Sequence, residues 1–317
     1  MSRPISRIPT EILADILVSA IQSMQPNIHG KAPHWRIRSV CRLWKEVADT
    51  TPQFWSEIRF PAVLQADSPI RQLKPKRLEG HLRLSKDAPL SIDVVVAPRP
   101  LLEAVPRIAH RLVSLKISMP QASRLEAFVD QLAKSTFPHL RELALESLDA
   151  IGTSLSRLHP EVFPILQNLT LRCLRLDFAS LTSLKSLTLI AIPAIQPSYM
   201  SLFPPALFSF ADLLDILAQL PQLTDLTLKR ACSHDTSTIA RTVELPRLES
   251  IYIHNECTQI VELLQSIALR PSTAIILDID AERSVPFISL SKQSATRSGI
   301  SPLPSKTGSS MDRPSNR

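Results

Sequence analysis

Two short segments of the chain carry the residues best suited to hold a metal ion. One is Cys232-Ser233-His234, and the other is His254-Asn255-Glu256-Cys257. Thiolate sulfur and imidazole nitrogen are ligands that tetrahedral Zn²⁺ prefers, so two cysteines and two histidines could hold one zinc ion. Each cysteine follows the last apolar residue of a strand-like segment by four positions. If these segments stack, the cysteines come close together.

A structural role explains the same residues more simply. Small polar or thiol side chains often satisfy the backbone where a chain turns after a strand, and the histidines can be solvated. The sequence contains no G-x-G-x-x-G, P-loop, G-x-S-x-G or H-E-x-x-H. Five glycines in 317 residues leave little material for a phosphate-binding loop. We therefore predict no metal, no cofactor and no enzymatic activity.

The elements that would position such residues recur along the middle of the chain as the pattern L-x-x-φ-x-φ, where φ is apolar. Apolar residues at every second position are typical of a short strand with one buried face. Full copies begin at Leu112, Leu140, Leu166, Leu184, Leu223 and Leu248, and shorter ones at Leu90 and Ile276. Segments 125–133, 208–220 and 257–268 between them are predicted to be helices.

The spacing of these copies predicts the architecture of residues 89–282. Successive copies lie 18 to 39 residues apart, and their average is near the leucine-rich-repeat period of roughly 20–29. Stacked strand–helix units then bury a common core as a solenoid. An alternative is a general α/β domain of parallel strands, which we disfavour because a doubly wound sheet needs longer and more regular helices.

The first 60 residues are predicted to be helical, and too small to bury their own apolar surface. Their first helix has two parallel apolar rows, formed by Ile8, Ile12, Ile16 and Ala20 and by Leu13, Leu17 and Ile21. A second helix stops before Pro52, and its apolar face carries Ile37, Val40, Cys41, Trp44, Val47 and Ala48. We expect a partner protein to cover part of this surface.

The order IPTEILADIL (8–17), VCRLWKEVAD (40–49) and TPQFW (51–55) resembles the F-box, in the F-box-like form common in mushroom-forming fungi. The resemblance implies docking onto the Skp-type adaptor of a cullin–RING ubiquitin ligase. Leucine-rich repeats after the F-box are also typical of this group. Ile8 replaces the usual leucine, and the loop between the helices is longer. The positions that would pack on the adaptor or join the helices are Pro9, Ile12, Leu13, Ile16, Leu17, Val40, Cys41, Trp44 and Trp55. The alternative is a three-helix cap whose tryptophans are ordinary core.

The predicted fold class is therefore mixed α/β, with a helical F-box-like domain followed by an irregular leucine-rich-repeat solenoid. The predicted boundaries are 1–60 for the F-box-like domain, 61–88 for a linker, 89–282 for the repeats and 283–317 for a disordered, Ser/Pro-rich basic tail. This tail supplies five of the seven net positive charges, so a nucleic-acid partner is not expected. No apolar run of 18 residues occurs, so no membrane span is expected.

These observations favour a substrate-recognition subunit of a Skp–cullin–F-box ubiquitin ligase, whose repeats bind an unidentified target protein. An adaptor-bound scaffold that does not promote ubiquitination is the alternative. Four scattered cysteines without a C-x-x-C motif indicate a reducing compartment, either cytoplasm or nucleus.

Overall fold

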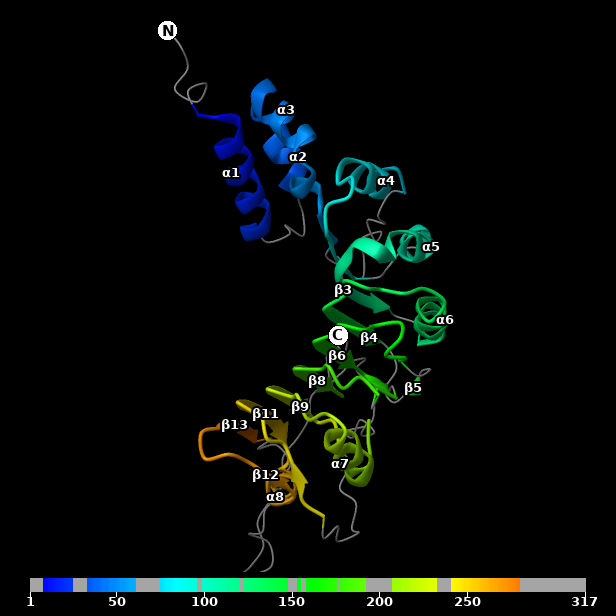
Figure 1. Cartoon of the computed structure of the whole chain (residues 1–317), viewed down its shortest axis with the longest axis vertical. Coiled ribbons are helices and arrows are strands. Elements are labelled where there is room, and N and C mark those ends of the chain that lie inside the picture. Colours follow the sequence, from blue (N-terminus) through cyan, green and yellow to red (C-terminus); the bar gives the residue numbers. More distant parts are fainter. Residues whose placement is uncertain are drawn as a thin grey trace, which may run out of the picture. The chain divides into compact units, whose positions relative to one another are not determined.

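The chain is built on one nine-stranded parallel sheet with helices along it (Figure 1). The computed structural model describes residues 8–24, 33–60, 75–95, 99–119, 122–147, 153–154, 158–175, 177–178, 180–191, 207–232 and 241–279. A single large apolar core runs along the sheet, and a smaller core lies among the N-terminal helices.

Among the described residues, three helices and a 3-10 turn precede the sheet. They are α1 (Thr10–Ser23), α2 (Pro33–Arg38), α3 (Arg42–Thr50) and η2 (Pro52–Trp55). The continuous second helix expected from the sequence is instead divided into α2 and α3. The Ser39 amide closes α2 by donating to the Trp35 and Arg36 carbonyls at 3.2 Å. Cys41 then takes an extended backbone before α3 begins.

The strands of the large sheet follow one another in chain order, without a reversal among the described strands. They are β1 (Glu57–Phe60), β2 (Leu90–Val95), β3 (Leu112–Met119), β4 (Glu142–Ser147), β6 (Asn168–Arg172), β8 (Ser186–Ile190), β9 (Asp225–Lys229), β11 (Ser250–Asn255) and β13 (Ala274–Ile279). The eight strands predicted from the sequence are confirmed, and β1 is additional. Two small parallel pairs join β5 (Thr153–Ser154) to β7 (Leu174–Arg175) and β10 (Val243–Glu244) to β12 (Ile267–Ala268).

Helices lie along one side of this sheet in Figure 1. They are α4 (Pro75–Leu84), α5 (Arg99–Ile108), α6 (Ala122–Leu132), α7 (Phe210–Ala218) and α8 (Cys257–Gln265). The last three confirm the helices predicted from the sequence. Ser209 caps α7, because its side chain accepts a hydrogen bond from the Asp212 amide at 3.1 Å.

The register of the sheet places one apolar residue of each strand in the same row. Leu115, Leu143 and Leu169 are consecutive partners, and the row continues through Leu187, Leu226 and Ile251. All are buried. Burial of apolar surface contributes roughly 25 cal/mol per Å², so this row and the parallel row through Ile117, Leu145 and Leu171 both stabilise the sheet.

Non-glycine residues turn the chain out of the sheet. Cys173, directly after β6, and Arg230, directly after β9, have φ angles of 57° and 52°. This left-handed region disfavours residues with a side chain. Hydrogen bonds hold both turns, since the Cys173 amide donates to Ile190 at 2.7 Å and the Arg230 amide to His254 at 2.8 Å.

Helix α4 and strand β1 join the N-terminal helices to the sheet. Leu78 of α4 is buried in the large core, whereas Leu84 packs against the N-terminal core. Between them, the His81 ring lies 5.1 Å from the Trp55 ring. The Ser91 amide donates to the Ser56 carbonyl at 3.0 Å, at the start of the β1–β2 pairing.

The fold class predicted from the sequence, a helical F-box followed by an irregular leucine-rich-repeat solenoid, is wrong. The chain is a mixed α/β protein with a nine-stranded parallel sheet, and β1 lies inside the segment assigned to the F-box. The structure agrees with the alternative, an α/β domain of parallel strands. The error has a physical reason: apolar alternation reports which face of a strand is buried, and this alternation does not distinguish between larger folds.

Two of the predicted domain boundaries can be compared with the structure. The predicted linker, 61–88, contains α4 and the residues that lead from α4 to β2, while residues 61–74 lie outside the described residues. The predicted disordered tail, 283–317, also lies outside them.

Truncating a side chain should destabilise the protein more on the buried face of the sheet than on the other face. Leu169→Ala should lower the free energy of unfolding by about 2–5 kcal/mol, because Leu169 is buried in the core row. Thr170 is the next residue of β6 and lies on the other face, so Thr170→Ala should lower the free energy of unfolding by less than about 1 kcal/mol. Urea unfolding followed by circular dichroism measures both, and equal losses would contradict this assignment of the faces.

Candidate protein-docking surfaces

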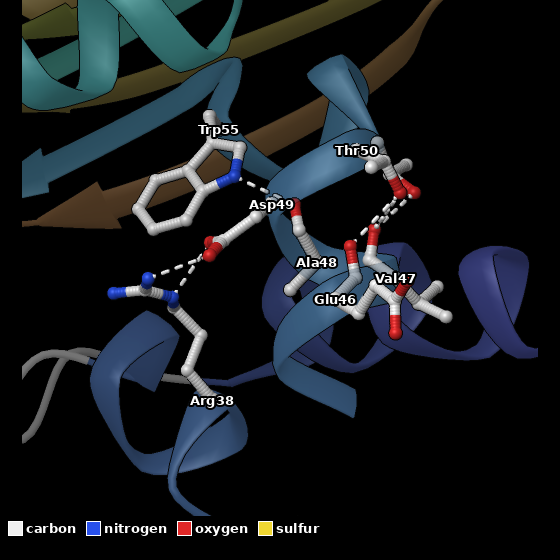
Figure 2. A network of polar contacts seen from close by, with 8 residues as sticks. Arg38, Glu46, Val47, Ala48, Asp49, Thr50 and Trp55 are labelled. Atoms are coloured by element: carbon white, nitrogen blue, oxygen red, sulfur yellow. Dashed lines mark hydrogen bonds and ion pairs between the residues drawn. The ribbon is translucent and has the colours of Figure 1, made fainter. Parts of the chain in front are cut away.

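Trp55 is the centre of the N-terminal core. Only 2% of its surface is exposed, and its indole Nε1 donates a hydrogen bond of 2.7 Å to the Ala48 carbonyl near the end of α3 (Figure 2). The ring of His34 from α2 stacks on the indole with the centroids 5.4 Å apart. Phe54 meets the indole edge-on at 5.2 Å. One side chain thus joins α2, α3 and η2.

An ion pair next to this indole fixes α2 against α3. Arg38 contacts the Asp49 carboxylate with two nitrogens, at 2.7 Å from Nε and 2.8 Å from Nη2 (Figure 2). Its guanidinium also lies over the Trp55 ring, 5.4 Å from the centroid. A bidentate, partly buried pair has a defined geometry that a single exposed pair lacks.

The broad apolar stripe expected on α1 is divided between two environments. Leu13, Leu17 and Ile21 are buried in the N-terminal core. Ile12 and Ile16 point away from it and remain 52% and 46% exposed. Leu13, Leu17 and Ile21 therefore hold the helices together. In the other row, Ile8 and Ala20 pack against the same core and only Ile12 and Ile16 are exposed.

The nine residues that the resemblance assigns to the adaptor contact occupy three environments. Leu13, Leu17 and Trp55 are buried within the chain itself, and Cys41 and Trp44 are half-buried. The exposed members are Pro9, Ile12, Ile16 and Val40, and Val40 is 58% exposed. We call Ile12, Ile16, Val40, Cys41 and Trp44 the N-terminal apolar surface. Ile12 and Ile16 lie on α1 and Trp44 on α3, and these two helices pack against each other. Val40 and Cys41 lie between α2 and α3.

The face of the sheet opposite the large core is polar from β1 to β11 and carries the exposed Ile276 on β13. We call it the open face. Its residues alternate with the buried row and are half-buried or exposed. One register row contains Glu57, Ser91, Ser114, Glu142, Asn168, Ser186, Asp225 and Ser250. The next contains Arg59, Asp93, Lys116, Ala144, Thr170, Thr188, Thr227 and Tyr252. Charged side chains thus flank a central group of small residues.

The charges near β3 and β4 are paired across strands. Glu142 accepts 2.9 Å and 2.7 Å contacts from Lys116 and Ser114. Burial disfavours its ionised form, but these hydrogen bonds outweigh that effect and lower the pKa of Glu142. Two residues further along, Glu146 contacts Arg172 at 2.7 Å and Ser118 at 2.7 Å.

A second polar cluster lies at the β11–β13 end of the open face. Asp278 contacts His254 Nδ1 and the Tyr252 hydroxyl, both at 2.9 Å. The hydrogen bond with His254, followed by that with Tyr252, lowers the pKa of Asp278. Lys229 lies over the Tyr252 ring, 5.0 Å from its centroid. The open face therefore presents ordered charges of both signs.

The cysteine and histidine segments do not gather as a metal site among the described residues. Cys232 is buried, and its sulfur accepts a 3.6 Å hydrogen bond from the amide of Asn255. His254 instead pairs with Asp278 on the open face. Ser233 and His234 lie outside the described residues, and the side chain of Cys257 is not described. The neighbouring strands β9 and β11 thus bring Cys232 next to the side chain of Asn255. The spacing of the cysteines did not indicate this contact.

No protein-family model, curated protein or solved structure matches this chain. Within the described residues, no helix is long and apolar enough to cross a membrane.

The sequence did not indicate two features of these surfaces. The open face was missed because its polar residues sit between the leucines that define the strands, and no motif connects them along the chain. Trp35, which is exposed on α2, was also missed. The guanidinium of Arg38 lies over the Trp35 ring, 4.7 Å from its centroid. The i,i+3 spacing of these two residues on one helix could have suggested the contact.

Burial predicts an order of cysteine reactivity. Desolvation raises the pKa of Cys173 and of Cys232 to about 11. The thiolate is the reactive form, so a higher pKa leaves less of it at pH 8, by about a hundredfold for two pKa units. Iodoacetamide should modify half-buried Cys41 first. Peptide mapping by mass spectrometry measures the order, and equal rates for Cys41 and Cys232 in the folded chain would contradict it.

Proposed function

We propose that this chain is a substrate-recognition subunit of a Skp–cullin–F-box type ubiquitin ligase and acts in the cytoplasm or nucleus. In this proposal the N-terminal apolar surface docks the Skp-type adaptor, and the open face binds the target protein. The resemblance of residues 8–58 to the F-box motif suggests the adaptor.

The exposure of Ile12 and Ile16 carries the adaptor part of the proposal. Leu13, Leu17 and Trp55 already satisfy the internal packing of the helices, so the outward isoleucines contribute little to folding. Isolated exposed apolar residues are common. Val40, between α2 and α3, is a third exposed aliphatic side chain among the N-terminal helices. In this proposal the three side chains form one contact, because grouped apolar exposure is typical of a protein-binding surface.

The open face supports a role in target binding. Its acids and bases are held in place by cross-strand contacts such as Lys116–Glu142 and Arg172–Glu146, so little side-chain entropy is lost when a partner binds. The small residues Thr170 and Thr188 between these charges and the Tyr252 cluster permit close approach. Complementary charges on a target would then determine specificity more than affinity.

The proposed mechanism is proximity. A subunit that holds a target and a ubiquitin-carrying enzyme in one complex raises their effective concentration, and it needs no catalytic residue of its own. This mechanism is consistent with the state of Cys173 and Cys232, whose buried thiols have raised pKa values and are unsuited to act as nucleophiles.

The adaptor contact is tested with the double variant Ile12→Asp/Ile16→Asp in the full chain. A Skp-type adaptor co-expressed with it should be recovered at less than about a tenth of the wild-type amount, since each carboxylate would be buried without a partner. Thermal unfolding should change little, because both positions are exposed. Quantitative co-purification measures the first effect and differential scanning calorimetry the second.

Val261→Asp is the matched control, because Val261 of α8 is also 46% exposed and lies in another helix. This variant should retain wild-type recovery of the adaptor. If the double variant also retains it, the proposed adaptor surface is wrong.

A further inference from the structure

A cavity of about 550 Å³ lies where strands β2, β3, β4 and β6 begin. Its polar lining comes from Asp87, His110, Arg111, His139 and Arg141. These residues precede three neighbouring strands of the sheet, so the parallel topology brings them to one edge. The volume lies in the range of small-molecule sites. None of these residues belongs to the N-terminal apolar surface or to the open face.

The lining is positively charged and partly apolar. Two arginines and a single carboxylate, that of Asp87, line the cavity, and two imidazoles add further hydrogen-bonding groups. Val113 and Ile165 supply apolar surface between them. This combination matches a ligand with an oxyanion at one end and an apolar body at the other.

Arg111 is the buried member of this group, with only 9% of its surface exposed. Its Nη2 donates to the Ser85 hydroxyl, which fixes the guanidinium. Its Nε is buried, and no described atom accepts a hydrogen bond from it. A buried arginine is costly unless its charge is compensated. Asp87 interacts favourably with this charge, but the hydroxyl of Ser85 is neutral.

Arg141 complements Arg111 from the exposed side of the cavity. Its backbone is fixed by the sheet, since its amide donates to Val113 at 2.9 Å and its carbonyl accepts from Gln167 and Asn168 at 2.9 Å. No ion pair of its side chain occurs among the described residues. The backbone of Arg141 is therefore fixed, and its guanidinium is available to a ligand.

We propose that this cavity binds a small organic anion, a carboxylate or phosphate group carried on an apolar body. The anion lies between Arg111 and Arg141, with His110 and His139 beside it, and the apolar body covers Val113 and Ile165. Binding compensates the buried charge of Arg111. The site is independent of the proposed adaptor and target contacts, so its test does not depend on theirs.

The experiment is calorimetric titration of the full chain with two probes, phenyl phosphate and benzoate. At least one of them should bind saturably with a stoichiometry of one. Arg141→Gln should weaken that binding by about tenfold or more, because a charge-assisted hydrogen bond is lost. A higher affinity for phenyl phosphate identifies a phosphate ligand, and a higher affinity for benzoate identifies a carboxylate.

Lys185→Gln is the matched control. Lys185 holds the position before β8 that Arg141 holds before β4, since its carbonyl accepts from Thr224 and Asp225 in the same manner, but Lys185 does not line the cavity. This variant should bind the probe as the wild type does. The proposal is overturned if neither probe binds at millimolar concentration, if Arg141→Gln binds normally, or if Lys185→Gln loses as much affinity as Arg141→Gln.

Discussion

The burial of Trp55 is the interaction on which the N-terminal part of this protein depends. Its indole contacts His34 of α2, the Ala48 carbonyl of α3 and His81 of α4. Leu13 and Leu17 complete the same core. Because Leu13 and Leu17 face this core, Ile12 and Ile16 on the other side of α1 stay exposed. The surface available for docking is thus a consequence of how the internal core closes, and α4 connects that core to the sheet.

The sheet divides its residues by the same rule. Alternation along the strands from β1 to β11 sends apolar residues to the large core and polar residues to the open face, and the parallel register aligns both sets across these strands. The edge where the strands begin contributes a third environment, in which Arg111 and Arg141 converge on a cavity. A single topology therefore produces a packed core, a charged surface and an anion-binding cavity from positions that are distant in the chain.

Most strands were predictable because apolar residues alternate along each of them, and these residues are buried in every predicted strand except β13. The fold class was not, since Leu115 and Leu143 show the same alternation in several architectures. Strand β1 was missed because its four residues carry no repeat pattern, and α5 because Pro100 and Pro106 obscure a helix whose buried residues are Leu101, Ala104 and Val105. Among the candidate site residues, periodicity found Ile12 and Leu13 together, but only packing shows which of them faces outward.

Hydrogen–deuterium exchange of the full chain, with and without a Skp-type adaptor, tests the central claim most directly. The account predicts slower exchange on adding the adaptor for amides of α1 and of residues 40–50, with no change at α8 or in strands β8 to β13. Unchanged exchange throughout residues 10–50 at saturating adaptor, or protection confined to the sheet, would contradict it.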